Sequence, residues 1–170
     1  TIVNVMRGGP STGMPTKTEQ SDLKFAIYGT SGESPRCIMA PLDIYDCFWQ
    51  TMRAVRIAEK YQLPVIVLTD QALAYTSQNI PRPDLTGVEL GERLVPSRDA
   101  LREGFKRYEY TPTGISPMPI PGLHDLPYMA TGLEHTETGA PNYTPLNHEK
   151  MTEKRFLKLK TLGRAIVQQA

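Results

Sequence analysis

The sequence predicts an α/β fold in which helices flank a parallel sheet, and the pattern of its apolar residues is the reason. Short apolar runs at 2–6, 37–40 and 65–69 have the length and composition of buried strands. The segment 43–60 lies between two of these runs, and its apolar residues recur at helical spacing. A strand, a long helix and a second strand favour parallel pairing through a right-handed crossover. Three strands are few for a complete sheet, so we expect part of a larger one.

The stretch that follows the first expected strand is rich in glycine and begins with a cation. Residues 7–16 are RGGPSTGMPT. Glycine lets the backbone approach a ligand closely, and Arg7 carries a planar fork of donors that suits a carboxylate or a phosphate. Ligands of open α/β sheets bind beyond the carboxyl ends of the strands, where Arg7 is expected. The stretch is either an anion site or a tight turn with an ordinary surface arginine, and it lacks the spacing of a P-loop or a dinucleotide fingerprint.

A helix is expected directly after this stretch, over residues 17–28. Thr16 and Glu19 have the spacing of a capping box, with Thr16 as the N-cap, and Gly29 follows the last helical residue. The free amides at the start of such a helix favour an anion.

The clearest βαβ unit spans residues 35–70. Asp43 has the position of an N-cap for its helix. Asp70 ends its last strand at the edge where Arg7 is expected, and a capping or turn role is favoured there over contact with a ligand. The expected apolar stripe of the helix consists of Ile44, Phe48, Met52, Val55 and Ala58.

Residues 81–146 differ from the rest in composition and pattern, because ten of the fifteen prolines lie there and apolar periodicity is weak. We expect a long irregular arm that packs on the domain or on a partner. A solvated linker is disfavoured by its large apolar residues, which are Phe105, Tyr108, Tyr110, Leu126, Tyr128, Met129 and Leu133.

The histidines of the chain, His124, His135 and His148, lie in the arm or just after it. His124 with Asp125, or His135 with Glu134, has the composition of an acid–base pair. Hydrogen-bonded loop residues are the favoured interpretation, and their roles stay open.

The last helix is expected from Asn147 to about Gln168, within a C-terminal segment 147–170. Its apolar stripe consists of Met151, Leu159, Leu162 and Ile166, and basic residues dominate the rest. A basic amphipathic helix can bind a membrane or nucleic acid, but docking on a neighbouring domain is favoured because the chain as a whole is nearly neutral.

The composition bounds the class of protein. A net charge of +1 on 170 residues offers no general attraction to nucleic acid. No apolar stretch approaches the roughly 20 residues that cross a membrane. Cys37 and Cys47 lack the spacing of a metal or iron–sulfur site, so buried, reduced thiols in a cytoplasmic protein are expected. Thr1 opens almost directly into a strand, so we expect a piece of a longer chain.

Beyond these patterns, residues 7–23, RGGPSTGMPTKTEQSDL, resemble the α subunit of 2-oxoacid:ferredoxin oxidoreductases, especially the 2-oxoglutarate branch. Residues 131–139, TGLEHTETG, and 147–151, NHEKM, are similar to the same family. The resemblance implies an incomplete thiamine diphosphate-binding fold, with a partial pyrimidine-binding domain at 1–80, the arm at 81–146, and a last helix that leads to a following domain.

The resemblance also implies an activity. Members of the family convert a 2-oxoacid and coenzyme A into acyl-CoA and CO₂ and pass electrons to ferredoxin. The partner β subunit holds the diphosphate half of thiamine diphosphate, Mg²⁺ and an iron–sulfur cluster. Arg7 matches the arginine that binds the 2-oxoacid carboxylate, and Thr16 matches a threonine near the substrate. Ser11 and Thr12 belong to the same substrate loop, and Gly8 and Gly9 are expected beside the cofactor.

The chain departs from the family in what it lacks. An upstream stretch like YPITPS is absent, and neither Glu19 nor Glu33 has the context of the glutamate that activates the cofactor. We therefore expect no catalytic residue in this chain and no turnover by the chain alone. A non-catalytic interaction or scaffold module derived from the family is the alternative, and a nucleic-acid-binding basic helix is a third possibility.

Overall fold

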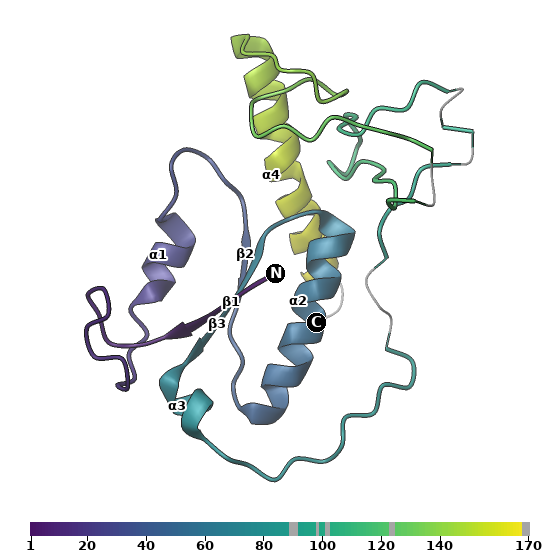
Figure 1. Ribbon diagram of the computed structural model, residues 1–170. Helices are drawn as coiled ribbons and strands as arrows, with labels where there is room; N and C mark the ends of the chain where they lie inside the picture. The colour runs from purple at the N-terminus through teal and green to yellow at the C-terminus, as the bar shows by residue number, and fades with distance from the viewer. Residues whose placement is uncertain (89–91, 98, 101–102, 123–124, 168–170) are drawn as a thin grey trace. The chain divides into compact units, whose positions relative to one another are not determined.

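The computed structural model describes residues 1–170 except 89–91, 98, 101–102, 123–124 and 168–170 (Figure 1). The chain divides into two compact units. Unit 1 contains Thr1–Glu59 and Leu63–Glu92, and unit 2 contains Lys60–Gln62 and Arg93–Ala170. This division by contact places residues 93–146 of the arm in the same unit as the last helix, and the start of the arm belongs to unit 1. The boundaries expected from the sequence, at 80 and 146, stay predictions.

Unit 1 is built on a parallel sheet, as predicted. The strands are β1 (Ile2–Met6), β2 (Cys37–Met39) and β3 (Val65–Asp70), in the order β1-β3-β2. Both pairings are parallel, and Met6 lies opposite Asp70 at the carboxyl ends of β1 and β3. The residues directly after these two strand ends therefore share one edge of the sheet.

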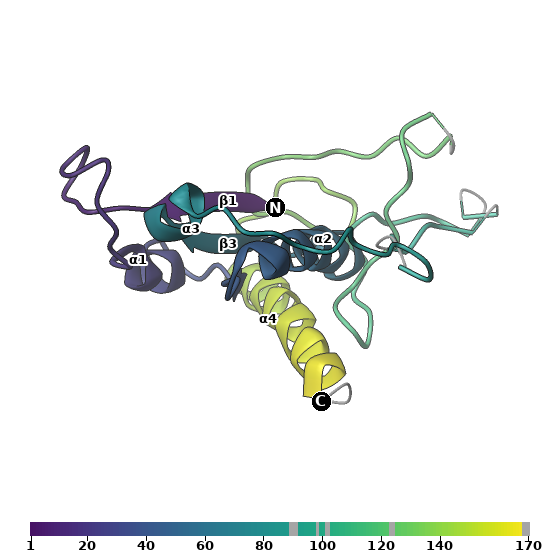
Figure 2. The same ribbon diagram turned by 90° about the horizontal axis from the view of Figure 1, so that it is seen from below.

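Helix α1 (Asp22–Tyr28) lies against one face of this sheet (Figures 1 and 2). Its Ala26 is buried with Met6 and Leu68, and Ile38 and Ile66 pack around them. The side chains of Val65 and Val67 point to the opposite face, since direction alternates along a strand, and both are buried. Both faces of β3 are therefore covered.

The predicted start of α1 is wrong. The helix begins at Asp22, and its N-cap, Ser21, forms no side-chain capping bond. The backbone of Lys17 is used elsewhere, because its N–H donates to Met14 O and its carbonyl accepts from Gly8 N. The Glu19 carboxylate accepts from Gly9 N at 3.2 Å. Closure of the preceding loop therefore replaces the expected capping box of Thr16 and Glu19.

Helix α2 (Ile44–Tyr61) forms as predicted, with a different buried face. The Asp43 carboxylate accepts a hydrogen bond from Asp46 N at 2.8 Å, as an N-cap does. The buried residues are Ala54, Ile57 and Tyr61, whereas Val55 of the expected stripe is 48% exposed. The short helix α3 (Gln71–Tyr75) follows β3 directly and was not predicted.

In unit 2, helix α4 (Pro145–Val167) is the one helix among the described residues that lies wholly inside the unit. Met151 and Leu162 are buried, as the stripe predicts, whereas Ile166 of the same stripe is 39% exposed. Lys154, expected on the solvated basic face, is only 6% exposed. The arm's apolar residues are mixed, with Leu126 buried and Met129 and Leu133 about half exposed.

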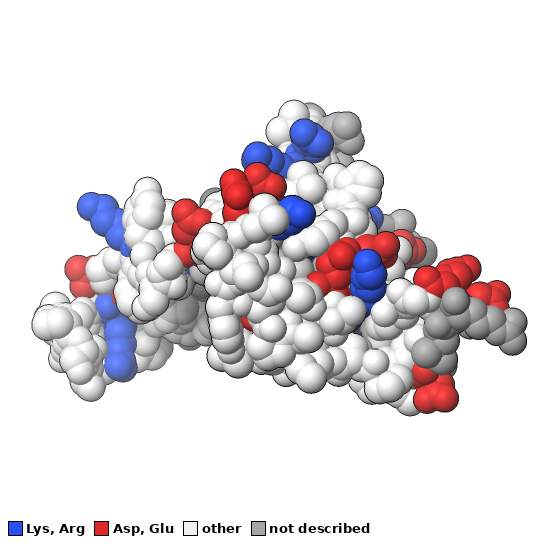
Figure 3. Space-filling model, turned by 90° about the horizontal axis from the view of Figure 1, so that it is seen from above, with Lys and Arg blue, Asp and Glu red and all other residues white. Residues whose placement is uncertain are grey.

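Charge is spread in small groups of both signs. On the face drawn in Figure 3, acidic and basic side chains alternate between wide uncharged areas, and no broad basic area is seen there. This agrees with the net charge of +1. None of the helices that the structure describes combines the length and apolar character of a membrane span.

Candidate functional site

The candidate site is the loop 7–19, called the Arg7 loop below, which leaves the carboxyl end of β1. Its backbone closes on itself, because Met14 N donates to Gly8 O and Gly8 N donates to Lys17 O, both at 2.9 Å. The peptide bond between Gly9 and Pro10 is cis. Residues 9–13 therefore form a small projecting turn above a hydrogen-bonded base, and Arg7 stands at that base.

The Arg7 side chain is half-buried and unengaged. It directly follows β1, beside the Met6–Asp70 pair at the sheet edge. Within the described residues, no hydrogen bond or ion pair is formed by its guanidinium. A half-buried guanidinium without a counter-ion is suited to bind an anionic ligand.

The hydroxyl groups of Ser11, Thr12 and Thr16 are exposed on the Arg7 loop. Ser11 has a positive φ of 53°. Thr16 is not an N-cap, so its hydroxyl is not engaged by α1. The structure brings these residues onto the same loop as Arg7, and their contact with a substrate stays a prediction.

The glycines of the loop differ in what they require. At Gly13, with φ +41°, an added Cβ would lie 2.6 Å from Gly8 O and 2.7 Å from Gly9 C, so only glycine fits. At Gly8 an added Cβ would lie 3.1 Å from Met14 Cε. At Gly9 the nearest atom, Ser11 N, lies at 4.0 Å. Packing within this chain therefore explains why glycine occupies positions 13 and 8. At Gly9 the space beside the backbone is open.

Asp70 anchors the loop to the sheet, a role that the sequence did not reveal. Its carboxylate caps α3 by accepting from Leu73 N at 3.0 Å, as the favoured interpretation predicted. It also accepts from Gln20 Nε2 at 3.0 Å, just after the loop. The hydrogen bonds from Gln20 and then Leu73 hold the pKa of Asp70 below its usual value, so the carboxylate stays ionised.

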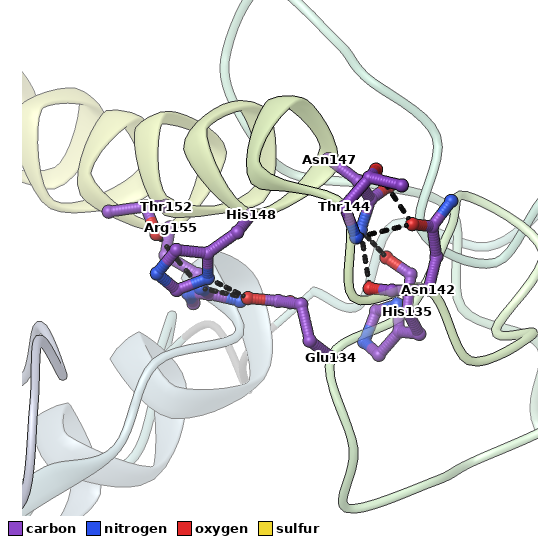
Figure 4. A network of polar contacts seen from close by, with 8 residues as sticks. All are labelled: Glu134, His135, Asn142, Thr144, Asn147, His148, Thr152 and Arg155. Atoms are coloured by element: carbon purple, nitrogen blue, oxygen red, sulfur yellow. Dashed lines mark hydrogen bonds and ion pairs between the residues drawn. The ribbon is translucent and has the colours of Figure 1, made fainter.

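The motif at 131–139 is held to α4 by a polar network in unit 2 (Figure 4). Glu134 accepts from both Nη atoms of Arg155 at 3.0 Å and lies 2.5 Å from His148 Nδ1. Asn147 donates to the carbonyls of His135 and Asn142. The similar motifs at 131–139 and 147–151 therefore contact each other, and most of their polar groups are used in structural contacts.

Hydrogen bonding is confirmed for His135 and His148, but His148 lies in α4 and not in a loop. His135 Nδ1 contacts Thr136 O, and its ring lies 4.0 Å from the Tyr108 ring. Glu134 is paired with Arg155 and His148, so the acid–base pair of Glu134 with His135 is not formed. His124 lies outside the described residues.

The cysteines are free thiols, as predicted, but both are half-buried and not buried as expected. Partial burial raises the pKa of Cys37 and of Cys47. In the part of the chain that the structure describes, no group of histidine, cysteine and carboxylate side chains has the geometry of a metal site.

Residues 1–154 match the family described as pyruvate flavodoxin/ferredoxin oxidoreductase, thiamine diphosphate-binding. The chain belongs to this family. The resemblance inferred from the Arg7 loop is therefore confirmed.

Curated relatives of the family include 2-oxoacid:ferredoxin oxidoreductase 1, subunit alpha, of Sulfurisphaera tokodaii, which is 38% identical over 99% of this chain and 27% of its own length. The 2-oxoglutarate oxidoreductase subunit KorA of Mycobacterium tuberculosis is 40% identical over 93% of this chain and 24% of its own length. The chain spans about a quarter of the length of these relatives.

A solved structure agrees with the fold of this family member. It is 2-oxoglutarate:ferredoxin oxidoreductase from Magnetococcus marinus with 2-oxoglutarate, coenzyme A and succinyl-CoA bound. The match has a TM-score of 0.85 and 50% identity, and it covers 94% of this chain and 27% of that chain. The small parallel sheet with its helices is thus the family's arrangement in this part of the molecule.

Proposed function

We propose that this chain is part of the α subunit of a 2-oxoacid:ferredoxin oxidoreductase, with 2-oxoglutarate as the substrate, and that its Arg7 loop receives the substrate carboxylate. The single observation that carries the proposal is the unengaged Arg7 guanidinium beside the carboxyl ends of β1 and β3. The Magnetococcus structure, half identical to this chain, holds 2-oxoglutarate and succinyl-CoA.

Arg7 orients the substrate in this proposal. A guanidinium binds a carboxylate through two parallel N–H···O bonds, which fix both its position and its plane. That orientation presents the neighbouring keto carbon for attack and for loss of CO₂. The exposed hydroxyls of Ser11, Thr12 and Thr16 supply donors near the keto oxygen or the distal part of the acid.

Thiamine diphosphate is the cofactor that the family implies, and the loop fits part of it. Gly9 leaves space in which a flat group can lie against the backbone, and Glu19 keeps Gly9 N–H turned inward. Gly8 and Gly9 are therefore the proposed cofactor contacts of this chain. When bound, the cofactor supplies an electron sink for decarboxylation. The diphosphate, Mg²⁺ and an iron–sulfur cluster are assigned to the partner β subunit.

The overall reaction balances as follows. One 2-oxoacid and one coenzyme A give one acyl-CoA, one CO₂, one proton and two electrons, and ferredoxin accepts the electrons. This chain contributes binding and orientation, and its described residues supply no proposed proton donor. The cytoplasm is the proposed location, since the ferredoxin and coenzyme A pools lie there.

A partner subunit also accounts for apolar surface on unit 1. On α1, Phe25 is 72% exposed and Tyr28 is 78% exposed. On β1, Ile2 and Val3 are more than half exposed. Exposed apolar groups that cluster on neighbouring elements are typical of a protein interface. The rest of the α subunit covers part of this surface in the proposal, because the chain spans about a quarter of its relatives, and their names as α subunits favour other subunits as a further cover.

The test uses the complete enzyme reconstituted from both subunits, with 2-oxoacid-dependent dye reduction as the readout. Arg7→Ala is expected to raise KM for 2-oxoglutarate about 100-fold, because loss of a paired charge costs about 3 kcal/mol. Arg7→Lys should restore part of the affinity. Lys24→Ala removes an exposed cation from α1 and serves as the matched control.

An unchanged KM in Arg7→Ala would remove Arg7 from the role. A wild-type complex with no 2-oxoacid-dependent activity would instead favour the scaffold alternative. A substrate panel tests the choice of 2-oxoglutarate separately, because Arg7 recognises the carboxylate that all 2-oxoacids share.

A further inference from the structure

Unit 2 contains a group of buried cations that the proposed function does not use. Arg107 is 9% exposed and Lys154 is 6% exposed, and Lys158 is half-buried one helical turn after Lys154. We call these three residues the buried basic cluster. Cations are rarely buried without a carboxylate partner, because removal of a charge from water costs several kcal/mol.

Arg107 is held in place without a counter-ion. Its Nη1 donates to Gln62 Oε1 at 3.3 Å, and its Nη2 contacts Met118 Sδ at 2.8 Å. The guanidinium carbon lies 4.9 Å from the centre of the Tyr108 ring and 5.6 Å from that of Tyr128. These contacts fix the guanidinium plane but leave its charge uncompensated.

The Nε atom of Arg107 is buried and has no hydrogen-bond partner among the described residues. An unpaired buried donor costs about 1–3 kcal/mol, so it needs an explanation. The Nε–H group and a neighbouring Nη–H group form the edge of a guanidinium that binds an oxyanion through two bonds.

Lys154 and Lys158 lie close to the Arg107 guanidinium. Lys158 Nζ donates to the backbone carbonyl of Gln62 at 3.2 Å, and the side-chain carbonyl of Gln62 is the acceptor for Arg107. Lys154 forms no hydrogen bond or ion pair within the described part of unit 2. Burial, and then repulsion by Lys158 and Arg107, lowers the pKa of Lys154 to about 7.

The nearest carboxylates are already engaged by other groups. The two oxygens of Glu137 accept from Lys106 Nζ at 3.1 Å and from Tyr110 N at 3.0 Å. Both oxygens of Glu134 are used by Arg155 and His148. Glu137 also attracts Lys154, but it is shared with Lys106, so the three cations of the cluster keep an excess of positive charge.

We propose that Arg107, Lys154 and Lys158 form a binding site for a small oxyanion of the phosphate or sulfate class. Such an ion has several acceptor oxygens, enough for the free edge of Arg107 and for both ammonium groups. Its charge offsets the cost of burying the cluster. A small ion also suits a site in which two of the three cations are more than nine-tenths buried.

The test measures thermal unfolding of the complete subunit in its complex, in inorganic phosphate against chloride at equal ionic strength. Wild type is expected to gain Tm in a saturable way as phosphate rises. Lys154→Met is expected to bind phosphate about tenfold more weakly and to lose most of this gain. In chloride the same variant should match or exceed wild type, because a buried unpaired charge is replaced by an apolar chain of similar size.

Lys160→Met is the matched control, since Lys160 is an exposed lysine on the same helix, and it should keep the full phosphate response. Equal phosphate responses in Lys154→Met and wild type would overturn the proposal, as would no response in either. Crystals of the complex soaked with tungstate provide an independent measurement. A heavy-atom peak beside Arg107 Nε and Lys154 supports the site, whereas a protein carboxylate from another segment in that position overturns it.

Discussion

Replacement of Glu134 by glutamine should loosen the turn that carries the 131–139 motif. The carboxylate binds Arg155 through both oxygens and also contacts His148, and its side chain is only 17% exposed. Glutamine keeps the shape but has one acceptor oxygen. Its NH₂ group would face donors of Arg155 and His148, so at least one contact becomes repulsive.

The structure sets the size of the effect. Hydrogen bonds from Arg155, and then from His148, lower the pKa of Glu134 from 4.5 to about 2. That difference corresponds to about 3 kcal/mol of preference for the ionised form in the folded state. The side chains of Arg155 and His148 are 35% and 64% exposed, so solvent screens the pair. We therefore expect a loss of about 1–2 kcal/mol in Glu134→Gln.

The sign of the pH dependence follows from the lowered pKa. A carboxylate with a lower pKa in the folded state contributes its full stabilisation above pH 4.5. The contribution shrinks as the pH falls through this value toward about 2, where the folded carboxylate also takes up a proton. The difference between wild type and Glu134→Gln is thus largest near neutral pH and smaller in acid.

Hydrogen exchange read by mass spectrometry, on the complete subunit in its complex, measures this effect locally. The amides of Asn142 and Thr136 are bonded to the carbonyls of Glu134 and Ala140, so they report opening of the turn. Their protection should fall about 5- to 30-fold at neutral pH in Glu134→Gln. Glu149→Gln, an exposed glutamate on α4, should change nothing. Equal protection in Glu134→Gln and wild type, or a difference that grows in acid, would refute the reasoning.

Two further predictions concern the Arg7 loop and use the complete enzyme. Gly13→Ala should distort the loop and raise KM for 2-oxoglutarate, because its Cβ would lie 2.6 Å from Gly8 O. Gly9→Ala should keep the hydrogen-exchange protection of the loop and lower only the affinity for the cofactor. Asp70→Asn should raise KM with little change in kcat. Its Oδ1 can still cap α3, but its NH₂ group would face the Gln20 amide, and loss of that hydrogen bond costs about 1–2 kcal/mol. Steady-state kinetics check both, and a normal KM in Gly13→Ala or Asp70→Asn contradicts them.

The sheet was predictable because each of its strands is encoded by a continuous apolar run, which can be recognised without knowing the rest of the fold. The runs at 2–6 and 65–69 have the composition of strands and form β1 and β3. Only β3 is buried as expected, because Ile2 and Val3 of the edge strand β1 are more than half exposed. The position of Arg7 followed from that prediction alone, since a residue after a parallel strand lies at the ligand edge of the sheet. The buried face of α2 was predicted wrongly. At about 100° per residue Val55 lies in the middle of the expected apolar stripe, whereas the buried Ala54, Ile57 and Tyr61 lie on another side of the helix.

Burial of Lys154 could not be predicted from the sequence of α4. A lysine among many basic residues on a helix is normally solvated. Here the irregular arm covers it, and Gly114 permits this, because an added Cβ there would lie 2.7 Å from the Lys154 carbonyl. Contacts between an irregular segment and a helix leave no periodic signal, so the buried basic cluster becomes visible only in three dimensions.

The capping box was predicted wrongly because the helix cap and the closure of the Arg7 loop compete for the same Glu19 carboxylate. Thr16 and Glu19 have the right spacing for a cap, but the same carboxylate also lies within reach of Gly9 N, ten residues earlier. A loop that turns back on itself brings several free backbone donors close to one acidic residue. Glu19 satisfies one of these donors, and α1 then starts at Asp22, where Asn4 Nδ2 donates to the Asp22 carboxylate at 2.9 Å. The start of α1 is therefore set by the fold of the Arg7 loop, and Thr16 is left free for the substrate role proposed for it.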